Sequence, residues 1–290
     1  MLYLCRHKYK KRNNMVTLNE VLEIPSYSGM EDRVIDFIVE FCNKHNLEWY
    51  LDDYNNVYVT KGKIKDGEHY PCVVAHTDTV HYDQMDMVKN NEKIKIVEST
   101  IGGKTKLTGW CESTNSPTGI GGDDKVGVYI CLNLLLEFDV IKAAFFVEEE
   151  TGMRGSREAD PNFFENVGYA IQFDGPTRNW FSKTLMGKNL WDEDFLTDVK
   201  PLLESYSVDN FSIDPFTDVL QLVEKFGFCC SVFPTGYYNQ HSKNEYVIPE
   251  ETEECYNLGK DALKVLGLKK YTFNEKKTKK KESEDLIWTY

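Results

Sequence analysis

The sequence predicts an α/β fold, a three-layer sandwich in which helices cover both faces of a mostly parallel central sheet. Short apolar runs alternate with longer segments of helical periodicity along most of the chain. Unbroken apolar runs are typical of parallel strands, because helices bury both faces of such a sheet. The chain has 290 residues, of which 41% are hydrophobic, which is enough for one large domain with a substantial core.

The first helices are predicted from their starts. Thr17-x-x-Glu20 and Ser28-x-x-Glu31 have the spacing of capping boxes, in which side chains of the first turn bond to free backbone amides. Apolar residues recur at helical spacing over 34–42, so the second helix is expected to bury one face.

Strands are predicted next along the chain. Residues 47–51 and 56–60 alternate in polarity, and the apolar run 70–75 is expected to be a buried strand that ends at His76. Over residues 93–109 isoleucine alternates with lysine, which indicates a β-ribbon.

The second half continues the alternation of helices and strands. A mostly apolar, and therefore buried, helix is expected from Asp123, and a closing helix over 249–266 begins with Pro249 in its first turn. Between them the pattern predicts strands at 143–147, 169–173 and 228–233 and helices near 192–206 and 215–226.

Charged or imidazole groups follow four of the predicted strands. His76, the Glu149-Glu150 pair and Asp174 come directly after a strand, and His241 follows another by a short loop. In open sheets of this kind, functional sites lie beyond the carboxyl ends of the strands. We therefore expect these side chains to meet at one edge of the sheet.

Five of the residues form a plausible ligand set of two imidazoles and three carboxylates: His76, Asp123, Glu150, Asp174 and His241. Nitrogen and oxygen ligands suit catalytic zinc, manganese or cobalt, whereas structural zinc sites are built from thiolates. Five ligands are too many for one open tetrahedral zinc. They fit two divalent ions, zinc favoured, that share one carboxylate and lie about 3.5–4 Å apart.

Helper residues stand beside the candidate ligands. Asp78 is placed to accept the second N–H of the His76 imidazole. Glu149, next to Glu150, is placed to face water as a general base. Each residue taken alone also has an ordinary structural explanation, such as a helix cap for the Asp123-Asp124 pair. His81 is expected at the surface, because no strand end presents it.

The motifs resemble a known group of enzymes. In chain order they are AHTDTV (75–80), GIGGDDKVG (119–127), EETGMRGS (149–156), FDGP (173–176) and HSKNEYV (241–247). Over roughly residues 17–266 the chain resembles the co-catalytic dinuclear zinc exopeptidase clan, most closely the peptidase T, glutamate carboxypeptidase and aminoacylase family. The resemblance implies a zinc exopeptidase-like fold.

The resemblance also implies a role for each residue. His76 and Asp174 would be ligands of one ion, with Asp78 orienting His76. The bridging carboxylate is the first of an acidic pair in this family, which implies Asp123 rather than Asp124. The other roles implied are Glu149 as catalytic base and Glu150 and His241 as ligands of the second ion.

The family usually inserts a dimerisation (lid) domain between the positions that match Asp174 and His241. That segment is too short here to hold such a domain besides the strands and helices expected in it. We therefore expect a single catalytic domain over residues 15–268, and a monomer or an oligomer that does not depend on a lid.

Three functions fit these observations. The first is a peptidase acting on short peptides, with an aminopeptidase favoured, in which a hydroxide bridging the metals attacks and Glu149 acts as base. The second is an N-acyl amino acid deacylase on the same scaffold. The third, an inactive binding module, is disfavoured because all candidate ligands and Glu149 are present.

Charge and cysteine content restrict partners and compartment. The formal net charge is −13, although residues 6–12 and 269–281 are basic, so the body between them repels nucleic acid and anionic lipid. No apolar stretch is long enough for a transmembrane helix. The 8 cysteines include no Cys-x-x-Cys pair, which favours free thiols and a cytoplasmic protein.

The two ends lack any pattern that would bury them. Residues 1–14 are expected to be a disordered basic extension, with Met15 as an alternative start, and 269–290 a lysine-rich tail. A chain of residues 15–274 should therefore fold and stay active. A large loss of thermal stability in that shortened chain would show that one end docks on the body.

Overall fold

The central sheet has six strands in the order β1-β2-β7-β3-β8-β12. This computed structural model describes residues 15–185, 188–214 and 217–273. The strands are β1 (Glu48–Leu51), β2 (Val57–Lys61), β3 (Tyr70–His76), β7 (Ile141–Phe146), β8 (Val167–Gly175) and β12 (Cys229–Pro234). β7, β3, β8 and β12 run parallel, and β1 and β2 pair antiparallel at one edge. Four parallel strands thus end at the same edge of the sheet.

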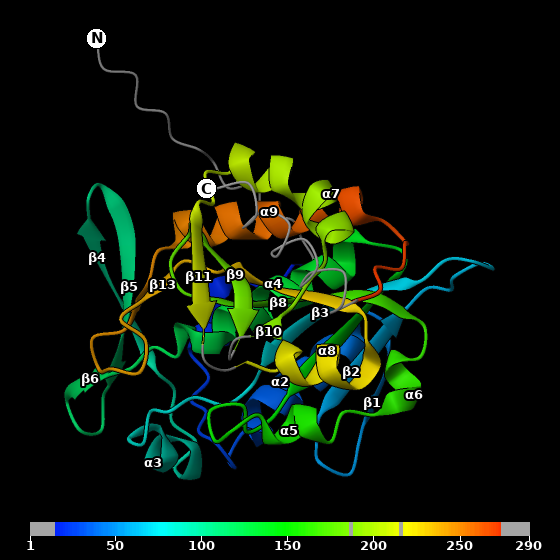
Figure 1. Cartoon of the computed structure of the whole chain (residues 1–290). Coiled ribbons are helices and arrows are strands. Elements are labelled where there is room, and N and C mark those ends of the chain that lie inside the picture. The colour runs from blue at the N-terminus through cyan, green and yellow to red at the C-terminus, as the bar shows by residue number, and fades with distance from the viewer. Residues whose placement is uncertain (1–14, 186–187, 215–216, 274–290) are drawn as a thin grey trace.

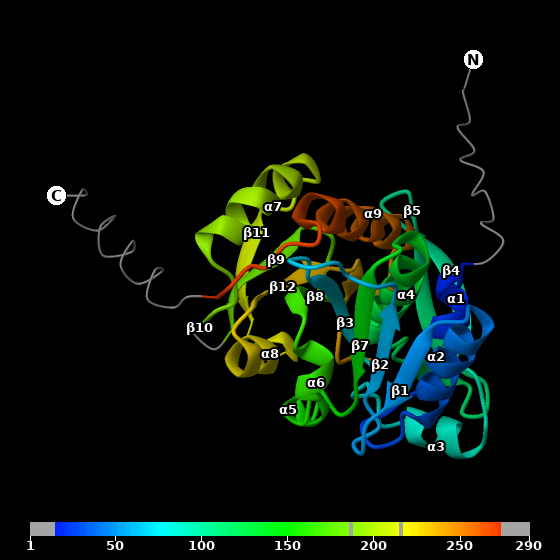
Figure 2. The same cartoon turned by 90° about the vertical axis from the view of Figure 1, so that its right-hand side faces the viewer.

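Helices cover both faces of this sheet (Figure 2). On one side lie α1 (Leu18–Leu22), α2 (Asp32–Lys44), α4 (Gly122–Glu137) and α9 (Pro249–Leu266). On the other side lie α5 (Arg154–Arg157), α6 (Pro161–Phe164) and α8 (Val219–Phe226). α4 packs against β3, β7 and β8 on one side and against α1 and α9 on the other, which is why most of its residues are buried. The predicted three-layer α/β sandwich is confirmed.

A second sheet forms the ribbon that extends from the body in Figure 1. It contains β4 (Lys95–Ile101), β5 (Lys104–Cys111), β6 (Ser116–Thr118), β13 (Tyr237–Tyr238) and β14 (Tyr246–Val247). The short helix α3 (Gln84–Lys89) precedes it in the chain. Because β13 and β14 flank the loop that carries His241, this sheet joins that loop to β5.

A third sheet was not foreseen from the sequence. β10 (Lys188–Asn189), β9 (Trp180–Leu185) and β11 (Asn210–Asp214) form it, and α7 (Glu193–Ser205) connects β10 to β11. It lies within the segment between Asp174 and His241, the place of the lid domain in the enzymes that the motifs resemble. α7 packs against α9, and β9 packs against β12, so this segment lies against the body.

Local signals had mixed outcomes. The Thr17 and Glu20 capping box is present at the start of α1. The second capping box is wrong, because α2 begins at Asp32 and has no side-chain cap. The Ser28 hydroxyl instead donates to Asp78 Oδ2 at 2.6 Å. The hydroxyl that would accept from a backbone N–H in a capping box thus donates to a distant, fully buried carboxylate instead.

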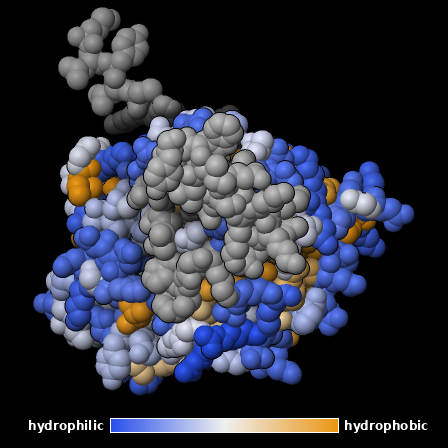
Figure 3. Space-filling model, viewed as in Figure 1, coloured by the Kyte–Doolittle hydropathy of each residue, from blue (hydrophilic) through white to orange (hydrophobic). Residues whose placement is uncertain are grey.

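Surface and core follow the expected division. All seven cysteines among the described residues are free and buried, and Cys5 lies outside them. The face drawn in Figure 3 is mainly hydrophilic, with small separate apolar patches outside the grey atoms. None of the helices formed by the described residues combines the length and apolar composition needed to cross a membrane. The residues expected to form the two terminal extensions lie largely outside the described ranges.

Candidate metal centre

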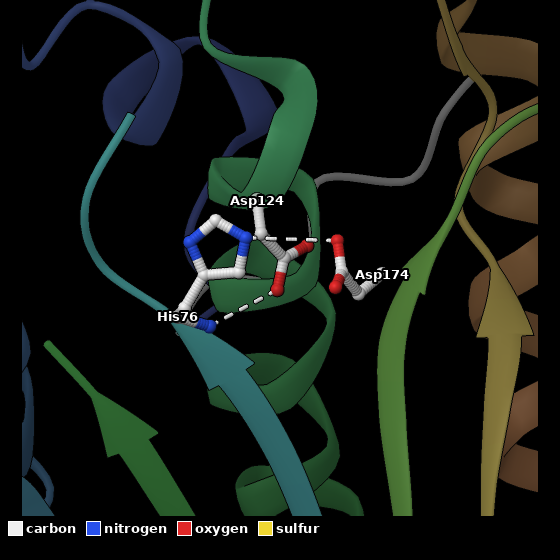
Figure 4. A group of neighbouring side chains, drawn as sticks. All are labelled: His76, Asp124 and Asp174. Atoms are coloured by element: carbon white, nitrogen blue, oxygen red, sulfur yellow. Dashed lines mark hydrogen bonds and ion pairs between the residues drawn. The ribbon is translucent and has the colours of Figure 1, made fainter. Parts of the chain in front are cut away.

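Five segments bring the predicted ligands together at the carboxyl edge of the sheet. His76 ends β3, Asp174 lies near the end of β8, and Glu150 follows β7. Asp123 lies at the start of α4, and His241 lies in the loop between β13 and β14. Figure 4 shows His76 of β3 with Asp174 of β8 beside its ring and Asp124 of α4 beside its backbone nitrogen.

The Asp123 carboxylate lies between two imidazoles. Its Oδ1 is 3.0 Å from His76 Nε2, and its Oδ2 is 3.3 Å from His241 Nε2. One carboxylate therefore presents a separate oxygen to each histidine. This is the arrangement that a carboxylate shared by two metal ions requires.

Each histidine has a further acidic neighbour. Asp174 Oδ1 is 3.6 Å from His76 Nε2, and Glu150 Oε1 is 3.1 Å from His241 Nε2. The buried Glu150 Oε1 accepts no hydrogen bond with good geometry from the described residues. Burying a carboxylate oxygen that accepts no hydrogen bond costs free energy unless a cation neutralises its charge. The donor set therefore fits a pair of divalent ions.

Asp124 is also close enough to be a ligand, because His76, Asp124 and Asp174 form one compact group of potential ligand atoms. Both of its oxygens are already occupied, however. Oδ2 accepts from the backbone N–H of His76 at 3.1 Å, and Oδ1 accepts from the N–H of Gly127 at 3.0 Å. A Cβ at Gly127 would lie 2.3 Å from that Oδ1, so the contact needs glycine. Asp124 thus fastens α4 to the end of β3, and the geometry favours Asp123 as the ligand.

Asp78 is fully buried and holds two parts of the site. His76 Nδ1 lies 3.2 Å from both its Oδ1 and its backbone oxygen, so Asp78 is close enough for the orienting role that the sequence predicts. The same carboxylate accepts from the backbone N–H of Glu149 at 2.9 Å and of Glu150 at 3.1 Å. Asp78 therefore also sets the turn that carries the acidic pair, a role that sequence reasoning missed, as it missed the bond from Ser28.

Glu149 faces the cluster without being tied to it. Its Oε2 is 4.0 Å from His76 Nε2, and its carboxylate accepts no hydrogen bond from the described residues. Burial raises the pKa of Glu149 well above its ordinary value. A carboxylate with a raised pKa and free oxygens is suited to accept and return a proton.

Crowding of carboxylates shapes the electrostatics of the site. Burial, followed by the charge of Asp123, raises the pKa of Asp174 well above its usual range. Burial also disfavours the charged form of Asp123, yet hydrogen bonds from His241 and His76 hold its pKa below the usual range. Asp123 thus keeps its negative charge between the two histidines, where a bound cation would contact it.

The support around Asp174 was not predicted. The Thr217 hydroxyl donates to its Oδ2 at 2.8 Å, and the Tyr237 hydroxyl donates to its backbone oxygen at 2.8 Å. The Gln172 amide lies 3.3 Å from both Asp174 Oδ2 and Asp218 Oδ2. Burial raises the pKa of the fully buried Asp218 to about 7. In the sequence Asp218 stood only as a polar residue within the helix predicted near 215–226, so no signal identified it as part of the site.

The surface position expected for His81 is wrong. Its side chain is buried, and its Nε2 lies 2.7 Å from Oε2 of Glu245. The two residues are 164 positions apart, so nothing local indicated the pair.

No family model and no curated protein matches this chain. Solved structures do. Aminopeptidase PepT from Bacillus cereus has a TM-score of 0.68 and 14% identity, covering 86% of this chain and 96% of that one. A tripeptidase from Staphylococcus aureus has a TM-score of 0.65 and 14% identity, and it too covers 86% of this chain and 96% of that one. The TET1 peptidase of Pyrococcus horikoshii has a TM-score of 0.62 and 15% identity, covering 85% of this chain and 99% of that one. The resemblance drawn from the motifs is thus confirmed at the level of the fold, which this chain shares with a solved aminopeptidase, a tripeptidase and a TET peptidase.

Proposed function

We propose that the chain is a metal-dependent hydrolase that cleaves peptide bonds of short peptides with two divalent ions, zinc favoured and cobalt or manganese possible. The observation that carries the proposal is the placement of the two Asp123 oxygens against His76 and His241. His76 and Asp174 would hold the first ion, Glu150 and His241 the second, and Asp123 both. When bound, such a pair polarises the scissile carbonyl and acidifies water.

The chain's own residues would handle the proton and the geometry. The Glu149 carboxylate takes the proton of the attacking water and passes it to the leaving amine nitrogen. Asp78 keeps the His76 ring oriented through Nδ1 and keeps the Glu149 backbone in place. Burial of Glu149 favours its protonated state between the two transfers.

An aminopeptidase is the preferred form of this function. Recognition of a substrate carboxylate needs free cations. Three basic groups near the motifs are already engaged. Lys125 is buried and donates to the Leu22 and Ile24 backbone oxygens at 3.0 and 2.8 Å. Arg154 lies 3.5 Å from Glu148, and Lys243 lies 3.7 Å from Asp83.

Most of the acids around the site are already engaged. Four acids could in principle face a substrate ammonium: Asp78, Asp124, Glu148 and Glu149. Asp78 and Asp124 are bonded to backbone amides, and Glu148 accepts from Tyr54 and pairs with Arg154. Of these four acids, Glu149 alone has a carboxylate that accepts no hydrogen bond from the described residues.

The test is a paired rate comparison under saturating zinc or cobalt. Free-amine dipeptides and tripeptides should be cut faster than N-acetylated versions of the same peptides. Two of the structural neighbours, an aminopeptidase and a tripeptidase, favour the same expectation. An unchanged or higher rate after acetylation would replace the aminopeptidase by the N-acyl amino acid deacylase. Absence of bound metal in the purified chain would instead support the inactive binding module.

We further propose a cytoplasmic location, since free buried thiols persist in a reducing compartment. The proposed partners are short peptides or N-acyl amino acids, without nucleic acid or membrane. A monomer, or an oligomer formed without a lid, follows from the small sheet that occupies the lid position.

A further inference from the structure

A fully buried carboxylate lies under the candidate metal centre. Glu245 has no exposed surface, and it sits four residues after His241 in the same loop. Its Oε2 accepts from the Gly121 backbone N–H at 2.7 Å, and its Oε1 accepts from the Asp123 backbone N–H at 3.0 Å. Three donors surround the buried charge once His81 Nε2, 2.7 Å from Oε2, is included.

The backbone around Glu245 is shaped to allow this approach. Gly121 has a φ of +67°, which side-chain-bearing residues rarely adopt. A Cβ at Gly119 would lie 2.0 Å from the His81 ring, so only glycine lets the loop lie against the imidazole. A Cβ at Gly122 would lie 2.7 Å from Cβ of Tyr237 and 2.9 Å from Cγ2 of Val247. The glycines of this loop therefore allow it to pack closely against the segment that carries Glu245.

Glu245 and His81 join the three segments that carry His76, Asp123 and His241. His81 belongs to the segment after His76, and its backbone oxygen accepts from Gln84 at 2.9 Å. Gln84 in turn donates from its amide to the Gly119 backbone oxygen at 2.8 Å. Because Asp123 N–H is bonded directly, a shift of Glu245 must move the backbone of the proposed bridging ligand.

We propose that Glu245, oriented by His81, is a positioning residue that sets the Asp123 carboxylate between His76 and His241 and thereby the affinity for both ions. This inference rests on the proposed function for its relevance to catalysis, but metal affinity tests it without catalysis. A carboxylate offers two acceptor oxygens for two backbone amides, which a carboxamide does not. In Glu245→Gln, one N–H of Gly121 or Asp123 faces an NH₂ group.

The experiment measures zinc affinity by chelator competition, together with kcat, KM and the melting temperature of the metal-free chain. Glu245→Gln is expected to bind both ions about 10–100-fold more weakly, the usual effect of losing a residue that orients metal ligands. Zinc at saturating concentration should restore much of the lost kcat, while KM for peptide changes little.

Glu250→Gln is the matched control. Glu250 also clamps a backbone amide, that of Thr105 at 3.1 Å, and accepts from the Thr105 hydroxyl at 2.8 Å, but it touches no candidate ligand. The Glu250→Gln substitution should lower the melting temperature of the metal-free chain without changing its zinc affinity. Equal losses of affinity in both variants would reduce Glu245 to a general structural role and overturn the inference.

A second pair of variants keeps the inference testable if Glu245→Gln folds poorly. His81→Gln retains an N–H donor toward Glu245, whereas His81→Leu leaves the buried carboxylate one donor short. Zinc affinity should be near wild type in the first and reduced in the second. Wild-type affinity in both, or in Glu245→Gln, overturns the inference. A wild-type chain that binds two ions but cuts no peptide overturns the proposed function alone.

Discussion

Glu149→Gln is expected to lower kcat at least ~100-fold while both metal ions stay bound, the usual size of a general-base effect. Glutamine keeps the size of the side chain and cannot take up a proton. Glu149 Oε2 is 4.0 Å from the nearest candidate ligand nitrogen, that of His76, and accepts no hydrogen bond from the described residues. Its replacement should therefore leave the ligands where they are.

Glu150→Gln is the natural comparison, because the two residues are adjacent and chemically alike. Glu150 Oε1 is buried, 3.1 Å from His241 Nε2, so an amide there should weaken metal binding. The measurement is metal content per chain together with kcat for one peptide in both variants. Metal loss in Glu149→Gln with retention in Glu150→Gln would show that the roles of the pair are reversed.

Elements with strong, local patterns were predictable from the sequence. The closing helix begins at Pro249 and ends at Leu266 as expected, because its start and period are both visible in the chain. The buried strand ending at His76 and the apolar helix at Asp123 were equally clear. Since parallel strands share one carboxyl edge, the ends of this and the three other predicted strands, with the start of the helix, were enough to expect the candidate ligands at one edge of the sheet.

Contacts between distant segments were not predictable. Ser28 has the spacing of a helix cap, yet its hydroxyl bonds to Asp78, 50 residues away. The pairing of His81 with Glu245 spans 164 residues, and Thr217 reaches Asp174 across 43. Each partner taken alone resembles an ordinary polar loop residue. The residues that hold the ligands in place are therefore visible only once the chain is folded.

Asp123→Ala is expected to lower occupancy at both metal sites, from about two ions per chain in the zinc-loaded wild type. The variant removes the oxygen near His76 and the oxygen near His241 in a single change. Stabilisation by metal should fall with it. An ion at 100 times its dissociation constant stabilises a fold by about 2.7 kcal/mol, so the rise in melting temperature on adding zinc should largely disappear.

Asp124→Asn is the control that separates the two neighbouring acids. Asp124 accepts from the backbone amides of His76 and Gly127, and an asparagine keeps one of these bonds. Its expected effect is a lower melting temperature of the metal-free chain with near-normal stoichiometry, because neither of the two bonds involves a proposed ligand atom. His76, Asp124 and Asp174 nevertheless form a compact ligand group, so the opposite result has a definite meaning. Wild-type stoichiometry in Asp123→Ala combined with metal loss in Asp124→Asn would make Asp124 the shared ligand and leave Asp123 as a hydrogen-bond partner of the two histidines.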